Sequence, residues 1–399
     1  MARVDERRLD DHMSMRLIAL CFGNFVIGTG TLIVPGMLSV LADGLGIGLP
    51  VAGQLITAFA LTVCFSAPVL AAATARLDRR TLLVGVLLLF ALGHAWAALV
   101  SDFGTLLAAR VVSAFGAALY TAQASVTAAL LVPAAQRGRA IAFTFLGWSI
   151  ASVVGMPAGA YIGATFGWRA GFVLVLVGAL MGIVALRVAL PSGVQVPQID
   201  GRVWRIFLSN PNLPLVIAVT VLQSAAQFAL FSYLVPGMKS LIGATPGLIS
   251  ALLAVFGVVG VAGNAACGRL VDRFGASAVV MGALLTMTFG HVLWALTAGS
   301  LPALVAVLIF WGTGCFAVNS AQQARLVGLS PPHAPVSIAM NTSAIYLGQA
   351  AGTAAAGSTL ELASDWHTYA ALPAIRLPLF AAAAVVSIAA ARRTVVSSR

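Results

Sequence analysis

A succession of long apolar stretches, separated by short polar turns, constrains this chain more than any other feature. A helix needs about 20 apolar residues to cross a bilayer, and the chain offers about twelve such stretches. Only helices or closed barrels satisfy the backbone inside lipid, and the alternating strands of a barrel are absent. The sequence therefore predicts membrane-spanning helices, which we place at residues 16–41, 50–74, 81–100, 105–132, 139–163, 168–190, 213–238, 246–267, 277–298, 301–327, 335–360 and 370–391.

The composition excludes the two or three soluble domains that a length of 399 residues would otherwise suggest. The chain is 60% hydrophobic and 8% charged, whereas soluble proteins carry about 25% charged residues. We therefore expect an all-α membrane protein with twelve transmembrane helices, surrounded by the lipid bilayer.

The placement of the basic residues predicts the orientation. Most of the 22 lysines and arginines fall on one side of the predicted spans, in agreement with the positive-inside rule. This puts both termini in the cytoplasm, and it argues against the nucleic-acid partner that a net charge of +11 would suggest. The other side holds Arg169, Lys239 and Arg376, and Arg110 remains inside a span. The cytoplasmic set is Arg3, Arg7, Arg8, Arg16, Arg76, Arg79, Arg80, Arg137, Arg139, Arg187, Arg202, Arg205, Arg269, Arg273, Arg325, Arg392, Arg393 and Arg399.

The cysteines predict neither a metal site nor disulfides. Cys21, Cys64, Cys267 and Cys315 fall in four separate spans and lack the spacing of metal ligands. We expect free thiols, no metal and no cofactor. No cleavable signal peptide is expected either, because the first apolar run is long enough to cross the membrane.

Short repeats divide the chain into two halves. Val34-Pro35-Gly36-Met37 recurs as Val235-Pro236-Gly237-Met238, and Gly93-His94 recurs as Gly290-His291. Ile141-Ala142 with Gly155 recurs as Ile338-Ala339 with Gly352. Parallel six-helix halves are a known transporter plan. We expect pseudo-symmetric bundles at residues 1–190 and 213–399, joined by a cytoplasmic linker at 191–212.

Two charged turns are the most distinctive motifs. The first copy contains Arg76, Asp78, Arg79 and Arg80; the second contains Gly268, Arg269, Asp272, Arg273 and Gly275. An aspartate can accept hydrogen bonds from a helix N-terminus, and the arginines can pair with carboxylates or helix C-terminal carbonyls. Such turns can act as conformational latches or simply as cytoplasmic anchors. Because the second copy keeps both glycines, we expect the stronger lock at Asp272 and Arg273.

These residues resemble the major facilitator superfamily, and most of all its bacterial twelve-helix drug and sugar efflux branch of drug:proton antiporters. The second charged turn, Ala109-Arg110-Val111-Val112-Ser113 with Gly116, Gly155-Met156-Pro157-Ala158-Gly159, and Gly167-Trp168-Arg169 carry the resemblance. The first turn departs from the family pattern at Ala75 and Asp78. The resemblance implies a monomeric secondary transporter of the bacterial inner membrane that works by alternating access.

Small residues recur at a spacing of four in two spans, which lets helices approach closely. They are Gly155, Gly159 and Gly163, with Pro157 bending the same helix, and Gly348 and Gly352. The resemblance implies that these helices meet between the halves. A sliding seam and static close packing are both compatible with the pattern.

The resemblance also places a substrate cavity at the membrane midplane. Arg110 is the leading candidate, since a charge inside a span is costly and is functional by default, although it could extend toward the outer side. Each of the other residues could instead be a polar group in helix packing. The substrate and coupling candidates are Arg110, Asn24, Thr31, Tyr120, Gln123, Gln223, Gln227, Tyr233, Trp311, Asn319, Gln322 and Asn341.

No acidic residue falls in the middle of a span, and Thr31 holds the place where many efflux relatives carry an acid. His94 and His291 titrate near neutral pH, but they lie in spans that are peripheral in the superfamily. We expect proton-coupled efflux of a small organic solute; the alternative is uptake or uncoupled facilitated diffusion of a small neutral solute. An enzyme is not expected, because nucleophile–base pairs, metal clusters and phosphate loops are absent.

Overall fold

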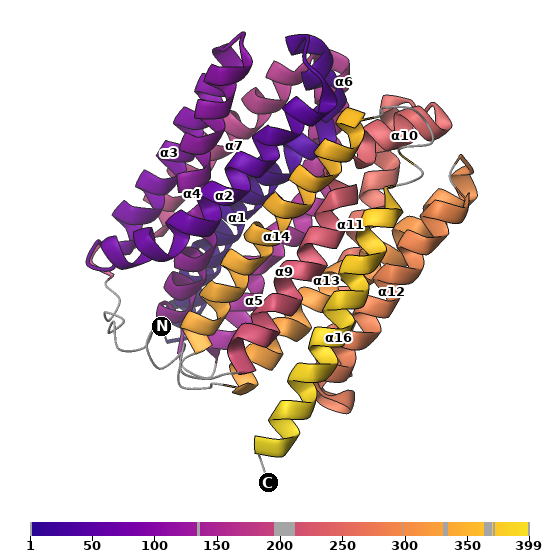
Figure 1. Cartoon of the computed structure of the whole chain (residues 1–399). Helices are drawn as coiled ribbons and strands as arrows, with labels where there is room; N and C mark the ends of the chain where they lie inside the picture. The colour runs from indigo at the N-terminus through magenta and orange to yellow at the C-terminus, as the bar shows by residue number, and fades with distance from the viewer. Residues whose placement is uncertain are drawn as a thin grey trace.

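The computed structural model describes residues 2–133, 136–194, 212–297, 299–329, 334–362, 369 and 372–397, and it is helical without strands in these ranges (Figure 1). Side chains at 2–13, 297, 334–336, 362, 373–375 and 394–397 are not described. The main helices are α1 (Ala2–Leu45), α2 (Leu49–Ala73), α3 (Arg79–Leu99), α4 (Phe103–Leu130), α5 (Arg137–Ile150), η2 (Ala151–Gly155), α6 (Met156–Phe166), α7 (Trp168–Ala189), α9 (Asn212–Phe231), α10 (Leu234–Ile242), α11 (Pro246–Phe274), α12 (Ala276–Thr297), α13 (Leu301–Leu329), α14 (Ala334–Leu362) and α16 (Pro373–Ser397).

Ten spans in the described residues are long and apolar enough to cross a membrane. One of them, Arg137–Phe166, comprises α5, η2 and α6. The helices α14 and α16 do not meet this criterion, but both pack into the same bundle, α14 against α9 and α2, and α16 against α9 and α12. The prediction of an all-α membrane protein is confirmed. The predicted linker lies largely outside the described residues, from 195 to 211.

Helix ends and breaks follow local chemistry. The side chains of Asp78 and Asp102 accept hydrogen bonds from the backbone N–H groups three residues later and so cap α3 and α4. Gly167 and Gly275 have φ values of 88° and 81° and occupy the turns before α7 and after α11, because glycine adopts this backbone region without strain.

Proline marks the irregular positions inside the spans. Pro35 precedes a kink at Met37 in α1, and Pro236 follows the break between α9 and α10. Pro157 directly follows the π-helical turn η2. Because proline has no N–H, it leaves a carbonyl in the preceding turn without its helical partner and bends the helix.

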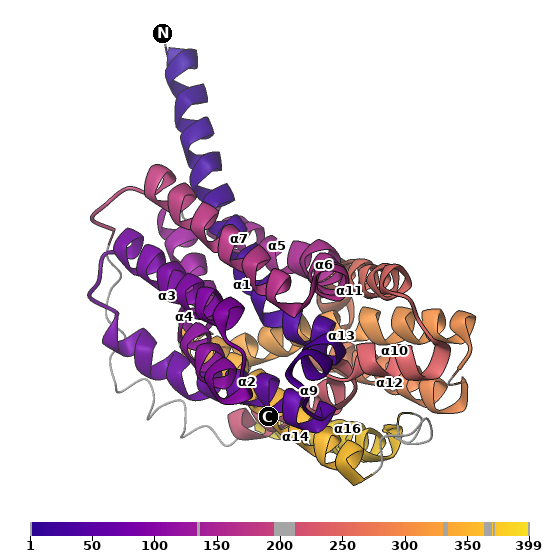
Figure 2. The ribbon, with the colours of Figure 1, turned by 90° about the horizontal axis from the view of Figure 1, so that it is seen from above.

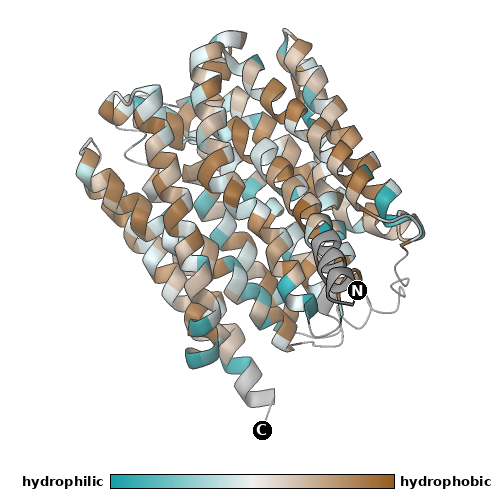
Figure 3. Cartoon of the chain, turned by 180° about the vertical axis from the view of Figure 1, so that it is seen from behind, coloured by the Kyte–Doolittle hydropathy of each residue, from teal (hydrophilic) through white to brown (hydrophobic). Residues whose placement is uncertain are grey.

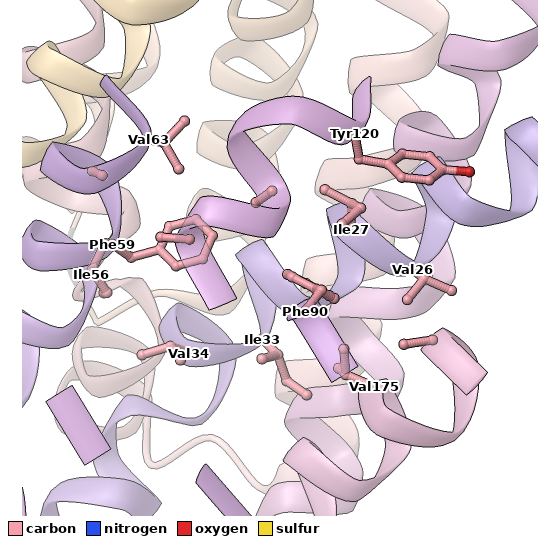
Figure 4. Close-up of a cluster of buried hydrophobic side chains, with 14 of the residues drawn as sticks. Val26, Ile27, Ile33, Val34, Ile56, Phe59, Val63, Phe90, Tyr120 and Val175 are labelled. Carbon is pink, nitrogen blue, oxygen red and sulfur yellow. The ribbon is translucent and has the colours of Figure 1, made fainter. Parts of the chain in front are cut away.

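Two large hydrophobic clusters form the interior. One is built mainly by α1, α2, α3, α4 and α7, and it includes Phe59, Phe90 and Tyr120 (Figure 4). The other is built mainly by α9 to α13 and α16, and it includes Phe256 and Trp311. We call α1 to α7, including α5, η2 and α6, the first group. We call α9 to α16, including α14, the second group. The colours of Figures 1 and 2 show them side by side.

The bundle has two polar ends. We call the end with the turns at 74–78, 131–133, 190–194 and Gly275 the terminal face, because both chain termini lie on this side (Figure 1). The end with the turns at 46–48, 100–102, Gly167 and 243–245 is the opposite face. Between them the helices are largely apolar (Figure 3), and exposed side chains such as Phe65, Val184 and Leu285 project from the bundle, as lipid contact requires.

The two groups meet along α2 and α14, along α11 with η2 and α6, and along α1 and α10. The last two contacts involve α6 and α10, which are the parts of their spans nearest the opposite face. There Tyr233, the residue just before α10, fits against Gly53 of α2 and Gly357 of α14. Ser250 Oγ of α11 donates to the Pro157 carbonyl of α6 at 3.1 Å. The groups are thus closely joined toward the opposite face.

Candidate functional site

Arg110 is fully enclosed within the first group. It is 1% exposed, its Nη1 donates to the Gly30 carbonyl of α1 at 3.1 Å, and its guanidinium lies 4.3 Å from the Phe59 ring of α2. The alternative in which this side chain extends outward is therefore wrong. His94 of α3 approaches the same glycine, since a Cβ on Gly30 would lie 2.8 Å from His94 Nε2. The structure brings a buried arginine and a buried histidine to one glycine of α1.

The other first-group candidates have separate surroundings. Asn24 Nδ2 donates to the Thr144 carbonyl of α5 at 2.9 Å, and the Tyr120 hydroxyl donates to the Leu20 carbonyl of α1 at 3.4 Å. Thr31 bonds within its own helix and interacts across the interface with the Tyr346 side chain of α14. Gln123 is the exception, because it accepts from Arg79 of the first charged turn instead of joining the other candidates.

Four of the second-group candidates take part in two separate sets of hydrogen bonds. Gln223 of α9 donates to Asn319 Oδ1 of α13 at 3.2 Å. Gln322 Nε2 donates to Thr220 Oγ1 at 3.1 Å, and Thr220 donates to Asn341 Oδ1 of α14 at 2.7 Å. The first set joins α9 to α13, and the second joins α9, α13 and α14.

Three other second-group candidates, Gln227, Tyr233 and Trp311, lie closer to the opposite face of the bundle than these hydrogen bonds do. Gln227 Nε2 lies 3.3 Å from Cys315 Sγ, and the Tyr233 hydroxyl donates to the Thr353 carbonyl at 3.3 Å. Trp311 is fully buried against Phe231, Phe256 and His291. These residues pack the second group.

Several buried amides keep unused hydrogen-bonding atoms. Asn24 Oδ1, Gln223 Oε1 and Gln322 Oε1 are acceptors without a partner among the described residues, and Asn341 Nδ2 is a donor in the same situation. Asn24 and Gln223 lie ten and eleven residues from Ser14 and Asn212 at the terminal-face ends of their spans, which is about 15 Å at 1.5 Å per residue. This is near the middle of a hydrocarbon core of about 30 Å. The atoms can bind a neutral, polar solute or water.

The structure also shows polar contacts outside the main candidate set. Ser320 of α13 donates to Asn264 Oδ1 of α11 at 2.5 Å, and Trp148 Nε1 of α5 donates to Thr121 Oγ1 of α4 at 3.1 Å. All four side chains are partly exposed. Spacing within one helix gives no signal for these pairs, because each hydrogen bond joins two different helices.

The first charged turn is closely held within its own group. Asp78 accepts from Thr81 N at 3.0 Å and from Gly193 N at 2.7 Å. Burial alone raises the pKa of the Asp78 carboxyl, but these hydrogen bonds outweigh it, so the pKa lies below its usual value. Arg79 is buried and donates to Gln123 and to the Ala75 carbonyl. Arg76 and Arg80 make no ion pair among the described residues.

The second charged turn is different from the prediction. Gly268 to Phe274 form the last two turns of α11 instead of a loop, and only Gly275 separates α11 from α12. Arg269, Asp272 and Arg273 are exposed. In the described part of the chain Asp272 has no hydrogen-bond partner, and Arg273 contacts only the ring of Phe274, at 5.0 Å. Among the described residues Asp272 and Arg273 form no hydrogen bond or ion pair across the groups, so the stronger lock at these residues stays a prediction.

The predicted glycine seam is wrong in its location. Added Cβ atoms on Gly155, Gly159 and Gly163 would meet Thr29, Ile33 and Met37 of α1. Added Cβ atoms on Gly348 and Gly352 would meet the α9 backbone near Val221 and Ala225. Both glycine stripes therefore pack helices inside a group, with Pro157 at the edge facing α11. The close approach between the groups is instead at Gly257 of α11. A Cβ added to Gly257 would lie 2.5 Å from the Ser152 carbonyl oxygen of η2.

Two arginines assigned to the polar ends are buried. Arg325 is 6% exposed and donates to the Ser387 side chain and carbonyl of α16 at 3.0 and 3.1 Å. Arg376 is fully buried in α16. Helix α16 starts at Pro373, so Arg376 lies in its first turn at the opposite-face end, where the sequence placed it, but neighbouring helices bury the side chain.

Comparison with known proteins agrees with a multi-pass membrane transporter. The sequence profile of the Major Facilitator Superfamily matches residues 20–239 and 217–397. The chain is 30% identical over 344 residues to the inner membrane transport protein YdhP of Escherichia coli K12, covering 86% of this chain and 88% of that protein. It is 33% identical over 352 residues to a chloramphenicol resistance protein of Streptomyces lividans, covering 87% and 90%.

The fold comparison shows the same overall architecture. A bacterial homolog of the human lysosomal transporter Spinster, solved in an inward-facing and occupied conformation, superposes with a TM-score of 0.77 at 17% identity, covering 94% of this chain and 96% of that one. The chain therefore belongs to the Major Facilitator Superfamily. It is a multi-pass transporter of the inner membrane and a secondary transporter of small solutes, not an enzyme.

Proposed function

We propose that this protein exports a small, neutral, amphipathic organic solute from the cytoplasm by alternating access, coupled to protons. Twelve helices cross the membrane in two six-helix halves, residues 1–190 and 213–399, and function within one chain. The terminal face is cytoplasmic, which the exposed Arg269 and Arg273 at this end support. The relative named for chloramphenicol resistance supports export as the direction.

The observation that carries the transport cycle is the position of the contacts along α11, which meets η2 and α6 toward the opposite face, whereas α2 and α14 also touch nearer the terminal face through Ser343 and Cys64. Close packing by Tyr233, Gly257 and Ser250 lies toward the opposite face, while the charged turn around Asp272 at the terminal face is unpaired. This arrangement corresponds to a cytoplasm-open state. The solved relative described as inward-facing supports the same assignment.

The unpaired amide atoms supply the chemistry for a neutral ligand. Asn24 Oδ1 and Gln223 Oε1 are free to accept hydrogen bonds near the midplane, and Asn341 Nδ2 is free to donate one nearer the terminal face. A dication would require carboxylates, and among described side chains the acids Asp43, Asp272 and Glu361 are exposed near helix ends.

We assign proton coupling to the pair of His94 and Arg110, which meet at Gly30. A proton on His94 would repel the Arg110 cation and loosen the contact between α4 and α1. The absence of a buried acid in the described spans favours the second candidate, uncoupled diffusion of a neutral solute, and the experiment separates the two.

The test uses purified protein in proteoliposomes with chloramphenicol as the probe solute. For protein inserted with its cytoplasmic side outward, we expect chloramphenicol uptake into the proteoliposomes to require an imposed pH gradient. The same uptake should be abolished in Gln223→Ala. His94→Phe should keep exchange at equilibrium while losing the response to the gradient. If the wild-type protein transports chloramphenicol at the same rate with and without the pH gradient, transport is uncoupled diffusion. If the protein does not transport chloramphenicol at all, the proposed export of such solutes is contradicted.

A further inference from the structure

Arg376 is the most unusual charge in the molecule. It is fully buried, and Nε, Nη1 and Nη2 all lack a hydrogen-bond partner among the described residues. The other buried arginines each donate at least one hydrogen bond: Arg79 to Gln123, Arg110 to Gly30 and Arg325 to Ser387. An enclosed cation without compensation is costly. Arg376 thus requires a counter-group that the described side chains do not provide.

His291 of α12 supplies a second unused group beside this cation. Its ring centroid lies 4.8 Å from that of Phe380, which follows Arg376 by about one turn of α16, and it interacts electrostatically with Arg376. His291 Nδ1 lies 2.8 Å from the Met287 carbonyl oxygen. A carbonyl only accepts, so Nδ1 carries the hydrogen and Nε2 is left as an acceptor. This Nε2 is buried without a partner.

We propose that Arg376 and His291 form a binding site for a small hydroxycarboxylic acid. The planar guanidinium matches a carboxylate with two parallel hydrogen bonds, and His291 Nε2 accepts from the hydroxyl of the same ligand. The rings of Phe380 and Trp294 provide apolar walls around the carbon skeleton. A ligand of this class satisfies the unpaired donors and the unpaired acceptor together.

This site is separate from the amides of the proposed cavity. Arg376 lies three residues after the first residue of α16, Pro373, or about 5 Å from the opposite-face end of the helix. Gln223 and Asn24 lie near the midplane. The site therefore goes beyond the proposed function and does not depend on the direction of transport.

The site adjoins the contact between the groups. Trp294 Nε1 donates to the Tyr369 carbonyl at 3.2 Å, and Tyr369 interacts with Tyr233, which fits against Gly53 of α2. The ligand enters as the groups separate at the opposite face, because separation withdraws Tyr233 from Gly53 and exposes the region around Tyr369.

The test measures binding to the purified full chain by calorimetry and thermal unfolding, with three matched probes. Lactate has the carboxylate and the hydroxyl, propionate lacks the hydroxyl, and lactamide lacks the carboxylate. We expect lactate to bind most tightly, propionate more weakly, and lactamide not at all, with sodium chloride as the ionic-strength control. Equal binding of all three probes, or no binding of lactate, would overturn the proposal.

Variants assign the binding to the two side chains. Arg376→Gln should weaken lactate binding about thirtyfold or more, as expected for truncating one partner of a buried charge pair. His291→Phe should reduce lactate to the affinity of propionate and leave propionate unchanged. Arg169→Gln is the control, because Arg169 is exposed on the same face and already donates to the Val100 carbonyl. Wild-type lactate affinity in Arg376→Gln would overturn the site.

Unliganded stability distinguishes a ligand site from an internal ion pair. Removing an unpaired buried charge should leave the unfolding temperature of Arg376→Gln equal to or above that of the wild-type chain. Asp365, the acid nearest in the sequence, lies outside the described residues, and Asp365→Asn tests it as an internal partner. If both substitutions lower the unfolding temperature equally and Asp365→Asn leaves lactate binding unchanged, the counter-group belongs to the chain and the proposal fails. Arg376→Lys, which keeps the charge without the planar fork, provides the binding comparison if Arg376→Gln does not fold.

Discussion

Gly257→Ala should shift the protein away from the conformation described here. A Cβ at this position would lie 2.5 Å from the Ser152 carbonyl oxygen and 2.8 Å from Val153 Cα. Both are backbone atoms of η2, so relief requires the two groups to move apart. Overpacking of this kind costs about 1–3 kcal/mol. The substitution also favours the helical state of α11 by about 1 kcal/mol, but that gain is present in every conformation in which α11 is helical and cancels.

The remaining cost applies only when the groups meet at this face, so it changes the conformational equilibrium by about 5- to 150-fold. Spin labels at positions 139 and 269, on the terminal-face ends of α5 and α11, would report the change after the four buried cysteines are replaced. We expect a larger fraction of short distances in Gly257→Ala. Gly282→Ala is the matched control, since nothing lies within 4 Å of its added Cβ. Identical distance distributions in Gly257→Ala and wild type would refute the assignment of this contact.

Two further predictions concern stability within the groups. Gly352→Ala should lower the unfolding temperature more than Gly155→Ala, because its added Cβ meets the Ala225 carbonyl oxygen at 2.0 Å whereas that of Gly155 meets the movable Thr29 side chain, and neither should change the spin-label distances. Asp78→Ala should cost about 0.5–2 kcal/mol through loss of the α3 cap, while Asp78→Asn keeps a capping oxygen and should cost less. Hydrogen bonds hold the pKa of the Asp78 carboxyl below its ordinary value of 3.8. The stabilisation by the carboxylate is therefore complete above pH 3.8 and is lost as the pH falls below it. Unfolding of the wild-type chain and Asp78→Asn compared across about pH 3 to 7 measures this loss, and an equal pH dependence of the two proteins would contradict it.

The sequence was sufficient for the helices and for the buried charge at Arg110. Apolar length determines which segments can cross a bilayer, and the predicted stretches coincide with the observed helices. Pro157 also indicated where its helix departs from regular geometry. These features are local, because they depend on residues within one or two turns of the same helix.

The sequence was insufficient for the partners of each helix face. Gly155 and Gly352 share their faces with other small residues, as the spacing of four predicted, but spacing along one helix does not identify the helix that approaches it. The same limit affected Gln123, which faces Arg79 and not the midplane. Arg376 lies at the opposite-face end of its helix, as the sequence indicated, but its burial depends on neighbouring helices that hydropathy does not identify.

The two charged turns therefore contribute differently to a conformational change. Only an interaction that differs between two states can alter their equilibrium. Asp78 and Arg79 bond to Thr81, Ala75 and Gln123 within the first group, so a rigid-body movement of that group preserves these bonds and the turn contributes stability alone. Asp272 and Arg269 are exposed and unpaired in the described structure. A surface ion pair stabilises a protein by about 0–1 kcal/mol. Any pair that these residues form only when the terminal face closes stabilises the closed conformation alone, so its whole energy shifts the equilibrium. The switching contribution consequently belongs to the second turn, although the first is the one with the ordered contacts.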